Sequence, residues 1–353
     1  LDLDIDGPLT EVRQRIADGA SADYTASRGE YLNGRVIAEL LGFDFIDPAE
    51  MIHFRANGAF DAEETQQAVN RRLREHERGV IPGFYGSTPD GKIKTFSRGG
   101  SDITGAIVAR GVGAEVYENW TDVSGLLMAD PRVVDTPKPI DKLTYRELRE
   151  LAYMGATVLH DEAIFPVRIA GIPVHIRNTN EPDAPGTLIV QDADPITQKG
   201  MITGIAGRKD FTIISIEKAL MNQEVGFGRR VLGVLENSGV SFEHMPSGID
   251  TLSVVVHDDL LEGKQDRVIG QLKAECEPDL IEVQPNMALI ATVGRGMAYT
   301  PGIAARLFTA LGSAEVNIRM IDQGSSELNI IVGVEADDFE KAMRAIYGEF
   351  VEA

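Results

Sequence analysis

The sequence predicts an α/β protein in which a layered αβα sheet is followed by two smaller βαββαβ units. Three observations support this fold class. Short apolar strands alternate with amphipathic helices along the first part of the chain, as in a mainly parallel layered sheet. The pattern changes near Asp192 and Pro195. Beyond that point, two similar passes of strands and helices follow one another, which indicates a repeated unit.

In the first part, apolar residues at helical spacing predict helices over residues 8–18, 28–41, 61–78, 101–110 and 145–153. Asp61, with Glu64 three residues later, is a capping pair that marks the start of the third helix. Strands are expected near residues 45–46, 51–52, 79–84, 115–117, 120–123 and 174–176. The composition of residues 88–91 predicts a hairpin turn.

In the second part, the first pass has strands at 211–216 and 251–257 and helices at 227–238 and 267–275. The second pass has strands at 287–293 and 328–334 and helices at 302–312 and 337–347. We therefore expect three domains, over residues 1–198, 199–285 and 286–353.

The composition excludes several classes of function. The chain of 353 residues carries a formal net charge of −21, which disfavours nucleic acid and anionic lipid as partners. Its one cysteine, Cys276, cannot form a disulfide within the chain, so we expect a reducing, cytoplasmic location. No apolar run reaches the ~18–20 residues of a membrane span, and no signal peptide is recognisable, so no membrane partner is expected. The scattered histidines form no metal-ligand cluster.

The segment from Ser97 to Asp102 has the residue types of a site for an amino acid. Gly99 and Gly100 allow the backbone to approach a charged ligand closely. Arg98 can bind a carboxylate through two parallel hydrogen bonds, and Asp102 can bind an ammonium group. Further on, Thr121 and Asp122 follow an apolar strand and could face a nucleotide.

The stretch from residue 95 to 189 resembles the aspartate kinases, and the order and spacing of its motifs carry the resemblance. The matching pieces are Gly83-Phe84, residues 97–102, residues 120–123, Asp130-Pro131-Arg132, residues 144–148, Gly155-Ala156, residues 158–160 and Gly186-Thr187.

The resemblance implies an amino-acid-kinase sheet. It also implies transfer of the γ-phosphoryl group of ATP, with Mg²⁺, to the β-carboxylate of L-aspartate. The product, 4-phospho-L-aspartate, is the first intermediate of lysine, threonine and methionine biosynthesis. In this family the aspartate would be bound by Glu30, Arg98, Gly99, Gly100, Ser101 and Asp102, with Arg98 and Asp102 as the catalytic pair. The nucleotide would be bound by Thr121, Asp122, Leu127, Asp130, Arg132, Thr157 and Val158.

The chain departs from the family pattern at several places. Many relatives carry an aromatic residue at the position of Leu127 and a lysine at that of Thr157, and they read His-Pro in place of His160-Asp161. The family's N-terminal Lys-Phe-Gly-Gly motif would lie before Leu1. Because that lysine stabilises the transferring phosphoryl group, we expect this chain to be a truncated piece with weak activity or none.

The two C-terminal passes resemble ACT domains, the amino-acid-sensing modules of aspartate kinases. The second match rests on residues 294–297, 302–304, 316–321 and 323–327. The strand at 202–206 would complete the second sheet, as in that family. The resemblance implies lysine or threonine as effector, bound where ACT units pair in a homodimer or higher homo-oligomer. The candidate effector residues are Met221, Gln223, Gly226, Phe227, Glu243 and Ser247.

Simpler interpretations remain open at this point. Arg98 and Asp102 could form a surface ion pair, Glu30 could face the dipole at a helix start, and Met221 and Phe227 could be core residues. A non-catalytic, amino-acid-binding regulatory protein and a kinase for another small acid, such as glutamate, are the alternative functions.

Overall fold

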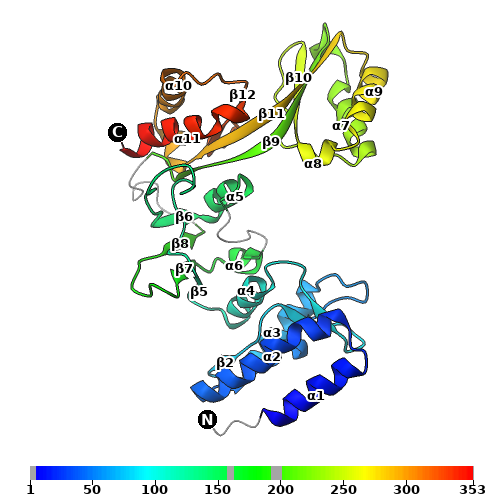
Figure 1. Ribbon diagram of the computed structural model, residues 1–353, viewed down its shortest axis with the longest axis vertical. Helices are drawn as coiled ribbons and strands as arrows, with labels where there is room; N and C mark the ends of the chain where they lie inside the picture. Colours follow the sequence, from blue (N-terminus) through cyan, green and yellow to red (C-terminus); the bar gives the residue numbers. More distant parts are fainter. Residues whose placement is uncertain (1–4, 157–162, 192–200, 353) are drawn as a thin grey trace. The chain divides into compact units, whose positions relative to one another are not determined.

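The computed structural model describes residues 5–156, 163–191 and 201–352, and the chain divides into two compact units (Figure 1). The first unit comprises Leu1–Gly125, Asp141–Tyr145 and Val158–Asp192. The second comprises Leu126–Ile140, Arg146–Thr157 and Ala193–Ala353. Two short segments of the N-terminal part, residues 126–140 and 146–157, therefore belong to the same unit as the C-terminal part of the chain.

The first unit opens with helices α1 (Asp6–Ala17) and α2 (Ala22–Leu41). Helix α2 begins six residues earlier than expected, because the Ser21 hydroxyl caps it by accepting a hydrogen bond from the Tyr24 N–H at 3.1 Å. Gly42, with φ of 65°, ends it. Glu30 consequently lies in the middle of α2, and its expected place in a first helical turn was wrong.

The next elements form a short parallel pair and a helix. Strand β1 (Asp44–Phe45) pairs with β2 (Gly79–Val80), and between them lie the 3₁₀ turn η1 (Pro48–Glu50) and helix α3 (Ala62–Leu73). The strand expected at 51–52 was wrong: these residues follow η1 as fully buried, irregular chain and pack with the apolar side of α3.

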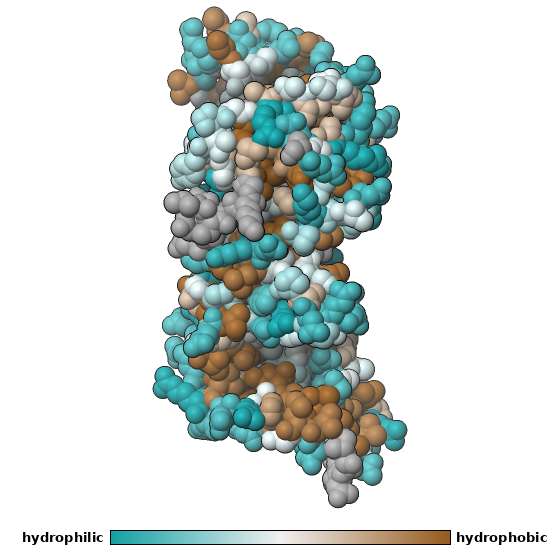
Figure 2. Space-filling model, turned by 90° about the vertical axis from the view of Figure 1, so that its left-hand side faces the viewer, coloured by the Kyte–Doolittle hydropathy of each residue, from teal (hydrophilic) through white to brown (hydrophobic). Residues whose placement is uncertain are grey.

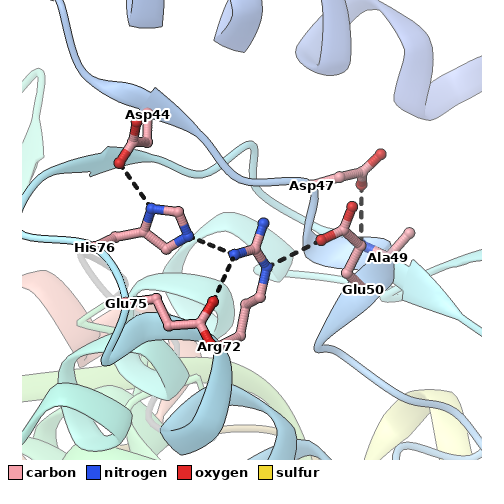
Figure 3. Close-up of polar contacts among 7 residues, drawn as sticks. All are labelled: Asp44, Asp47, Ala49, Glu50, Arg72, Glu75 and His76. Carbon is pink, nitrogen blue, oxygen red and sulfur yellow. Dashed lines mark hydrogen bonds and ion pairs between the residues drawn. The ribbon is translucent and has the colours of Figure 1, made fainter.

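Helix α3 ends five residues before the expected boundary, where a polar cluster forms (Figure 3). Arg72 donates from Nε to Glu50 at 3.1 Å and also contacts Glu75 and the His76 Nε2. Since that nitrogen accepts from the guanidinium, the ring proton belongs on Nδ1, which lies 2.7 Å from an Asp44 carboxylate oxygen. The chain thus leaves the helix where His76 can reach β1, and the cluster ties α3 to β1 and η1.

A hairpin of β3 (Tyr85–Ser87) and β4 (Ile93–Thr95) follows, with its turn where the composition predicted it. The Asp23 carboxylate of α2 accepts hydrogen bonds from Lys94 at 2.9 Å and from Thr95, which holds α2 against β4. Strand β4 then leads through residues 96–99 into α4 (Gly100–Val112).

The main sheet of the first unit has the order β5 (Tyr117–Thr121), β7 (Val174–Asn178), β8 (Thr187–Val190) and β6 (Lys142–Thr144). The outer pairs are parallel but β7 and β8 are antiparallel, so the sheet is mixed where a mainly parallel one was expected. The connection between β7 and β8 is too short for a crossover helix, and an antiparallel pairing is the result. Helices α4 and α6 (Phe165–Ala170) pack together in this unit.

The second unit contains one five-stranded antiparallel sheet, in the order β10 (Thr251–His257), β9 (Gly204–Glu217), β11 (Leu280–Val293), β13 (Asn329–Glu335) and β12 (Met320–Asp322). Strands β9 and β11 run side by side through its whole length (Figure 1). Residues 204–208 of β9 pair with 289–293 of β11, whereas 213–217 pair with 280–284. The two expected units therefore share one continuous sheet, and residues 204–206 pair in the half that holds β12 and β13.

Each half of this sheet has its own core and its own helices. One half carries η3 (Met221–Gln223), α7 (Phe227–Ser238), α8 (Asp258–Leu261) and α9 (Gln265–Cys276), around Val231, Val254 and Leu272. The other carries η4 (Arg295–Tyr299), α10 (Ile303–Ser313), η5 (Ala336–Asp338), α11 (Phe339–Tyr347) and η6 (Gly348–Glu352), around Ala288, Leu307 and Met343. The four long helices expected here are confirmed to within two residues.

Figure 2 shows apolar side chains gathered on one face of the first unit. The most exposed large apolar side chains of α1 and α2 are Ile16, Leu40 and Leu41. Among the described residues, no helix combines the length and the apolar character needed to cross a bilayer.

Candidate active site and effector site

The segment from Ser97 to Asp102 lies between β4 and the start of α4, and two glycines determine its shape. Gly99 adopts φ of 57° and ψ of 25° at the N-cap of α4, a left-handed conformation that favours glycine. A Cβ on Gly100 would lie 2.4 Å from the Phe84 Cβ, so only glycine lets this turn pack against the residue directly before β3. The structure thus brings residues 83–84 and 97–102 together.

Arg98 and Ser101 are solvent-exposed at this turn. In the described part of the chain, the Arg98 guanidinium makes no hydrogen bond or ion pair, so the surface pair with Asp102 that was an open alternative is not formed. A guanidinium without a carboxylate partner can bind an anionic ligand through two hydrogen bonds.

Asp102 is held in place by a residue that the sequence reasoning missed. The Asn119 amide on β5 donates to the Asp102 Oδ1 at 2.8 Å, and the same amide lies 3.1 Å from the Tyr117 hydroxyl. Burial raises the pKa of Tyr117, so its hydroxyl remains protonated. No pattern in the sequence marked this residue, because its burial, at 9% exposed, appears only in the folded chain.

Thr121 ends β5, at the edge where the carboxyl ends of the parallel strands β5 and β7 meet. Its carbonyl accepts from Thr179 N–H at 2.8 Å, and its hydroxyl donates to the exposed Asp122 carboxylate at 3.2 Å. Close by, the Ser124 hydroxyl accepts from Asn178 at 2.8 Å. The carboxyl edge of an open α/β sheet is where such folds bind ligands.

Three other predicted nucleotide residues, Leu127, Asp130 and Arg132, belong to the second unit. Leu127 is 37% exposed, and Arg132 is held by Asp130, whose oxygens accept from its Nε at 3.0 Å and its Nη2 at 2.6 Å. These hydrogen bonds hold the pKa of Asp130 below its usual value despite partial burial. Thr157 and Val158 lie outside the described residues. No group of three or more metal-ligating side chains occurs among the residues that are described.

Four of the predicted effector residues, Met221, Gln223, Gly226 and Phe227, lie at or just before the start of α7. Gly226, with φ of 83°, is the N-cap of α7, and Gln223 and Ser247 are exposed. Met221 and Phe227 are 8% and 4% exposed and belong to the core of this half of the sheet.

Glu243 is bound to the end of α5 (Tyr145–Tyr153), a helix from the kinase-like part of the chain. Its carboxylate accepts a short hydrogen bond from the Tyr153 hydroxyl. Burial, together with this carboxylate, raises the pKa of Tyr153 to about 12, so the hydroxyl is a donor at neutral pH. An effector ammonium group that engaged Glu243 would therefore compete with Tyr153.

The opposite end of α5 is anchored by a buried ion pair. Glu147 is fully buried and accepts from the Thr203 hydroxyl at 2.6 Å and from the Arg295 Nε at 3.0 Å. Between these ends, Glu150 accepts from the Asn329 amide at 2.6 Å. Within the second unit, α5 is thus attached to both halves of the sheet.

Comparisons with known proteins agree with this architecture. Residues 5–178 match the amino acid kinase family, and residues 290–350 match an ACT domain. Aspartokinase 3 of Bacillus subtilis (strain 168) is 42% identical over an alignment of 337 residues that covers 93% of this chain and 74% of that protein. Chloroplastic aspartokinase 1 of Arabidopsis thaliana is 30% identical, and the chain spans 61% of its length.

Solved structures give the same result. The crystal structure of Clostridium acetobutylicum aspartate kinase is 58% identical with a TM-score of 0.91, covering 99% of this chain and 80% of that one. E. coli aspartokinase III in complex with aspartate and ADP, in its R-state, is 26% identical with a TM-score of 0.71, over 97% of this chain and 79% of that one. The same enzyme has been solved with lysine and aspartate, in its T-state. By its sequence and its fold, the chain belongs to the aspartokinase family.

Proposed function

We propose that this chain carries out, as part of an aspartokinase, the ATP-dependent phosphorylation of the β-carboxylate of L-aspartate to 4-phospho-L-aspartate. The observation that carries this proposal is the glycine turn at 97–102, where Arg98 has no carboxylate partner among the described residues and Asp102 is oriented by Asn119. The similarity to an aspartokinase solved with aspartate and ADP supports the choice of substrates.

The chemistry requires positioning rather than a general base. The accepting carboxylate, with an ordinary pKa of about 3.9, is already ionised at neutral pH. The protein must align two anions and offset their repulsion. Arg98 would bind the α-carboxylate of aspartate, and Asp102 and Glu30 would orient its ammonium group. Thr121, Asp122, Leu127, Asp130, Arg132, Thr157 and Val158 would contact ATP, with Mg²⁺ held mostly by the phosphates.

The ACT part would supply feedback control by lysine or threonine, in a homodimer or higher homo-oligomer of the cytoplasm. Lysine is bound by the E. coli relative in its T-state. Glu243 would bind the effector ammonium group, with Met221, Gln223, Gly226, Phe227 and Ser247 around it. The hydrogen bond from Tyr153 to Glu243 gives this site a physical connection to α5. Such control would suit the first step of lysine, threonine and methionine biosynthesis.

The test measures aspartate binding and turnover separately on the whole chain. Aspartate binding is followed by calorimetry, and the acyl phosphate is trapped with hydroxylamine in the presence of Mg-ATP. Arg98→Met should abolish aspartate binding, whereas Arg110→Met, at the other end of α4, should leave it unchanged. Turnover together with binding would rule out the non-catalytic regulatory alternative. Aspartate binding that survives Arg98→Met would overturn the assignment of the site.

A further inference from the structure

A cavity of about 690 Å³ in the first unit is lined by α1, α2 and the hairpin that ends in β4. It shares no residue with the proposed aspartate, nucleotide or effector sites. The lining residues that matter for its chemistry are Arg15, Asp18, Tyr24, Arg28, Tyr31 and Lys92.

Arg28 is the unusual member of this lining, because it is a buried cation without a carboxylate. Its side chain is 7% exposed, and its Nε and Nη2 donate to the Ser27 hydroxyl oxygen at 3.1 and 3.0 Å. It forms no ion pair with any described residue, and Nη1 has no hydrogen-bond acceptor there. A buried charge normally requires a partner of opposite sign, because its desolvation is costly.

Three tyrosine rings surround the guanidinium and offset part of that cost. The Arg28 Cζ lies 4.6 Å from the centroid of Tyr24, 4.5 Å from Tyr31 and 5.0 Å from Tyr85. Cation–π contacts stabilise the charge through the ring faces. They leave the N–H groups in the plane of the guanidinium available, and an oxyanion would be their natural acceptor.

The remaining charges of the cavity indicate what else the ligand carries. Arg15 forms an ion pair with Glu11 at 2.8 Å, and Lys92 forms one with Asp90 at 2.7 Å. Both cations therefore already have a carboxylate partner within the chain. Asp18, by contrast, accepts only an amide hydrogen bond, from Gln14 at 2.9 Å.

Asp47 is the second lining carboxylate without a cation. It accepts from the Ala49 N–H and from the Tyr85 hydroxyl, both at 3.0 Å (Figure 3 shows the first). The lining therefore contains one unpaired guanidinium and two carboxylates that no lysine or arginine among the described residues neutralises. A ligand with one negative and one positive group would complement both.

We infer that this cavity is a second amino-acid site, in which Arg28 binds the α-carboxylate of a free amino acid and Asp18 and Asp47 face its ammonium group. The tyrosine rings and Val12 would contact its side chain. Arg28 and Glu30 are two residues apart on α2 and point in opposite directions around it, since each residue turns a helix by ~100°. The inference goes beyond the proposed function, because it concerns a pocket on the opposite face of α2.

The experiment is a thermal-shift screen of the whole chain against the twenty L-amino acids, followed by calorimetric titration of those that stabilise it. A ligand that binds only the folded chain raises its melting temperature. At least one amino acid should stabilise the wild type, Arg98→Met and Glu243→Gln alike. Arg28→Met should weaken its binding by about tenfold or more, because a buried charged hydrogen bond is lost.

Two further variants keep the inference falsifiable if Arg28→Met folds poorly. Arg28→Lys retains the charge but not the planar fork, and should also weaken binding. Asp18→Asn should weaken binding of the amino acid but not of acetate, the probe for the carboxylate alone. The inference is overturned if no stabilising amino acid depends on Arg28, or if acetate and inorganic phosphate bind as tightly as the amino acid. Loss of aspartate binding in Arg98→Met but not in Arg28→Met would separate this site from the proposed active site.

Discussion

Replacing Arg295 by methionine should destabilise the second unit severely, because a buried carboxylate loses a charged hydrogen bond. Glu147 is fully buried, and the Arg295 Nε donates to its carboxylate at 3.0 Å. The Arg295 side chain is itself only 18% exposed. Breaking one partner of a buried ion pair costs about 3–5 kcal/mol. For a domain of this size, 1 kcal/mol corresponds to a melting-temperature change of roughly 2–4 °C, so a loss of roughly 10 °C is expected.

A double variant separates the ion pair from general packing. Glu147→Met combined with Arg295→Met removes both charges and keeps the apolar volume, so it should recover most of the lost stability. Differential scanning calorimetry of the two single variants, the double variant and the wild type gives the four corners of the cycle. The reasoning fails if Arg295→Met shifts the melting temperature of this unit by less than about 3 °C. It also fails if the double variant is no more stable than Arg295→Met.

Three other predictions concern the sites and pH. Asn119→Ala should raise the KM for aspartate about tenfold with little change in kcat, because Asp102 loses a charged hydrogen bond; unchanged steady-state kinetics would contradict this. Tyr153→Phe should tighten calorimetric binding of the effector to Glu243, because the competing hydroxyl is gone, but weaken its effect on aspartate affinity; identical inhibition curves for variant and wild type would rule out this coupling. Burial opposes ionisation of Asp23, but hydrogen bonds from β4 lower its pKa below the usual value. The stabilisation is then present above the unfolded pKa of ~3.9 and lost as pH falls through the folded pKa. The melting temperature of the wild type should therefore exceed that of Asp23→Asn at neutral pH but not in acid. A difference that persists in acid would refute the stabilising role of the ionised Asp23 carboxylate.

The local periodicity of apolar residues was sufficient to predict most helices. Residues 145–153 were predicted as a helix with the bounds that the structure shows, and α7 likewise. The start of α2 was misplaced because Arg28 and Gly29 looked like a helix opening, whereas the Ser21 cap lies about two turns earlier. The sequence predicted two strands, at 202–206 and 211–216, where the structure has the single strand β9. The exposed middle of β9, around Lys209 and Asp210, interrupts the apolar pattern.

The residues proposed for the active site differ in how clearly the sequence marked them. The glycines and Arg98 were visible because close backbone approach and carboxylate binding demand particular residue types. Asn119 could not be identified from the sequence, because an asparagine within a strand has no distinctive local pattern. It acquires its role only when β5 lies beside α4. Residues 157 and 158 stay predictions, since they fall outside the described part of the chain.

By itself, the sequence determined the family, the order of the secondary-structure elements and the residue types of the proposed chemistry. These depend on spacing along the chain, which neighbouring residues establish. Only the tertiary structure decided which charges are buried and what they meet. Tyr153 and Glu243 are 90 residues apart in sequence, and the ring of Tyr85 that faces Arg28 comes from a different element. The free energy of a buried charge depends on such distant neighbours, and no local pattern encodes them.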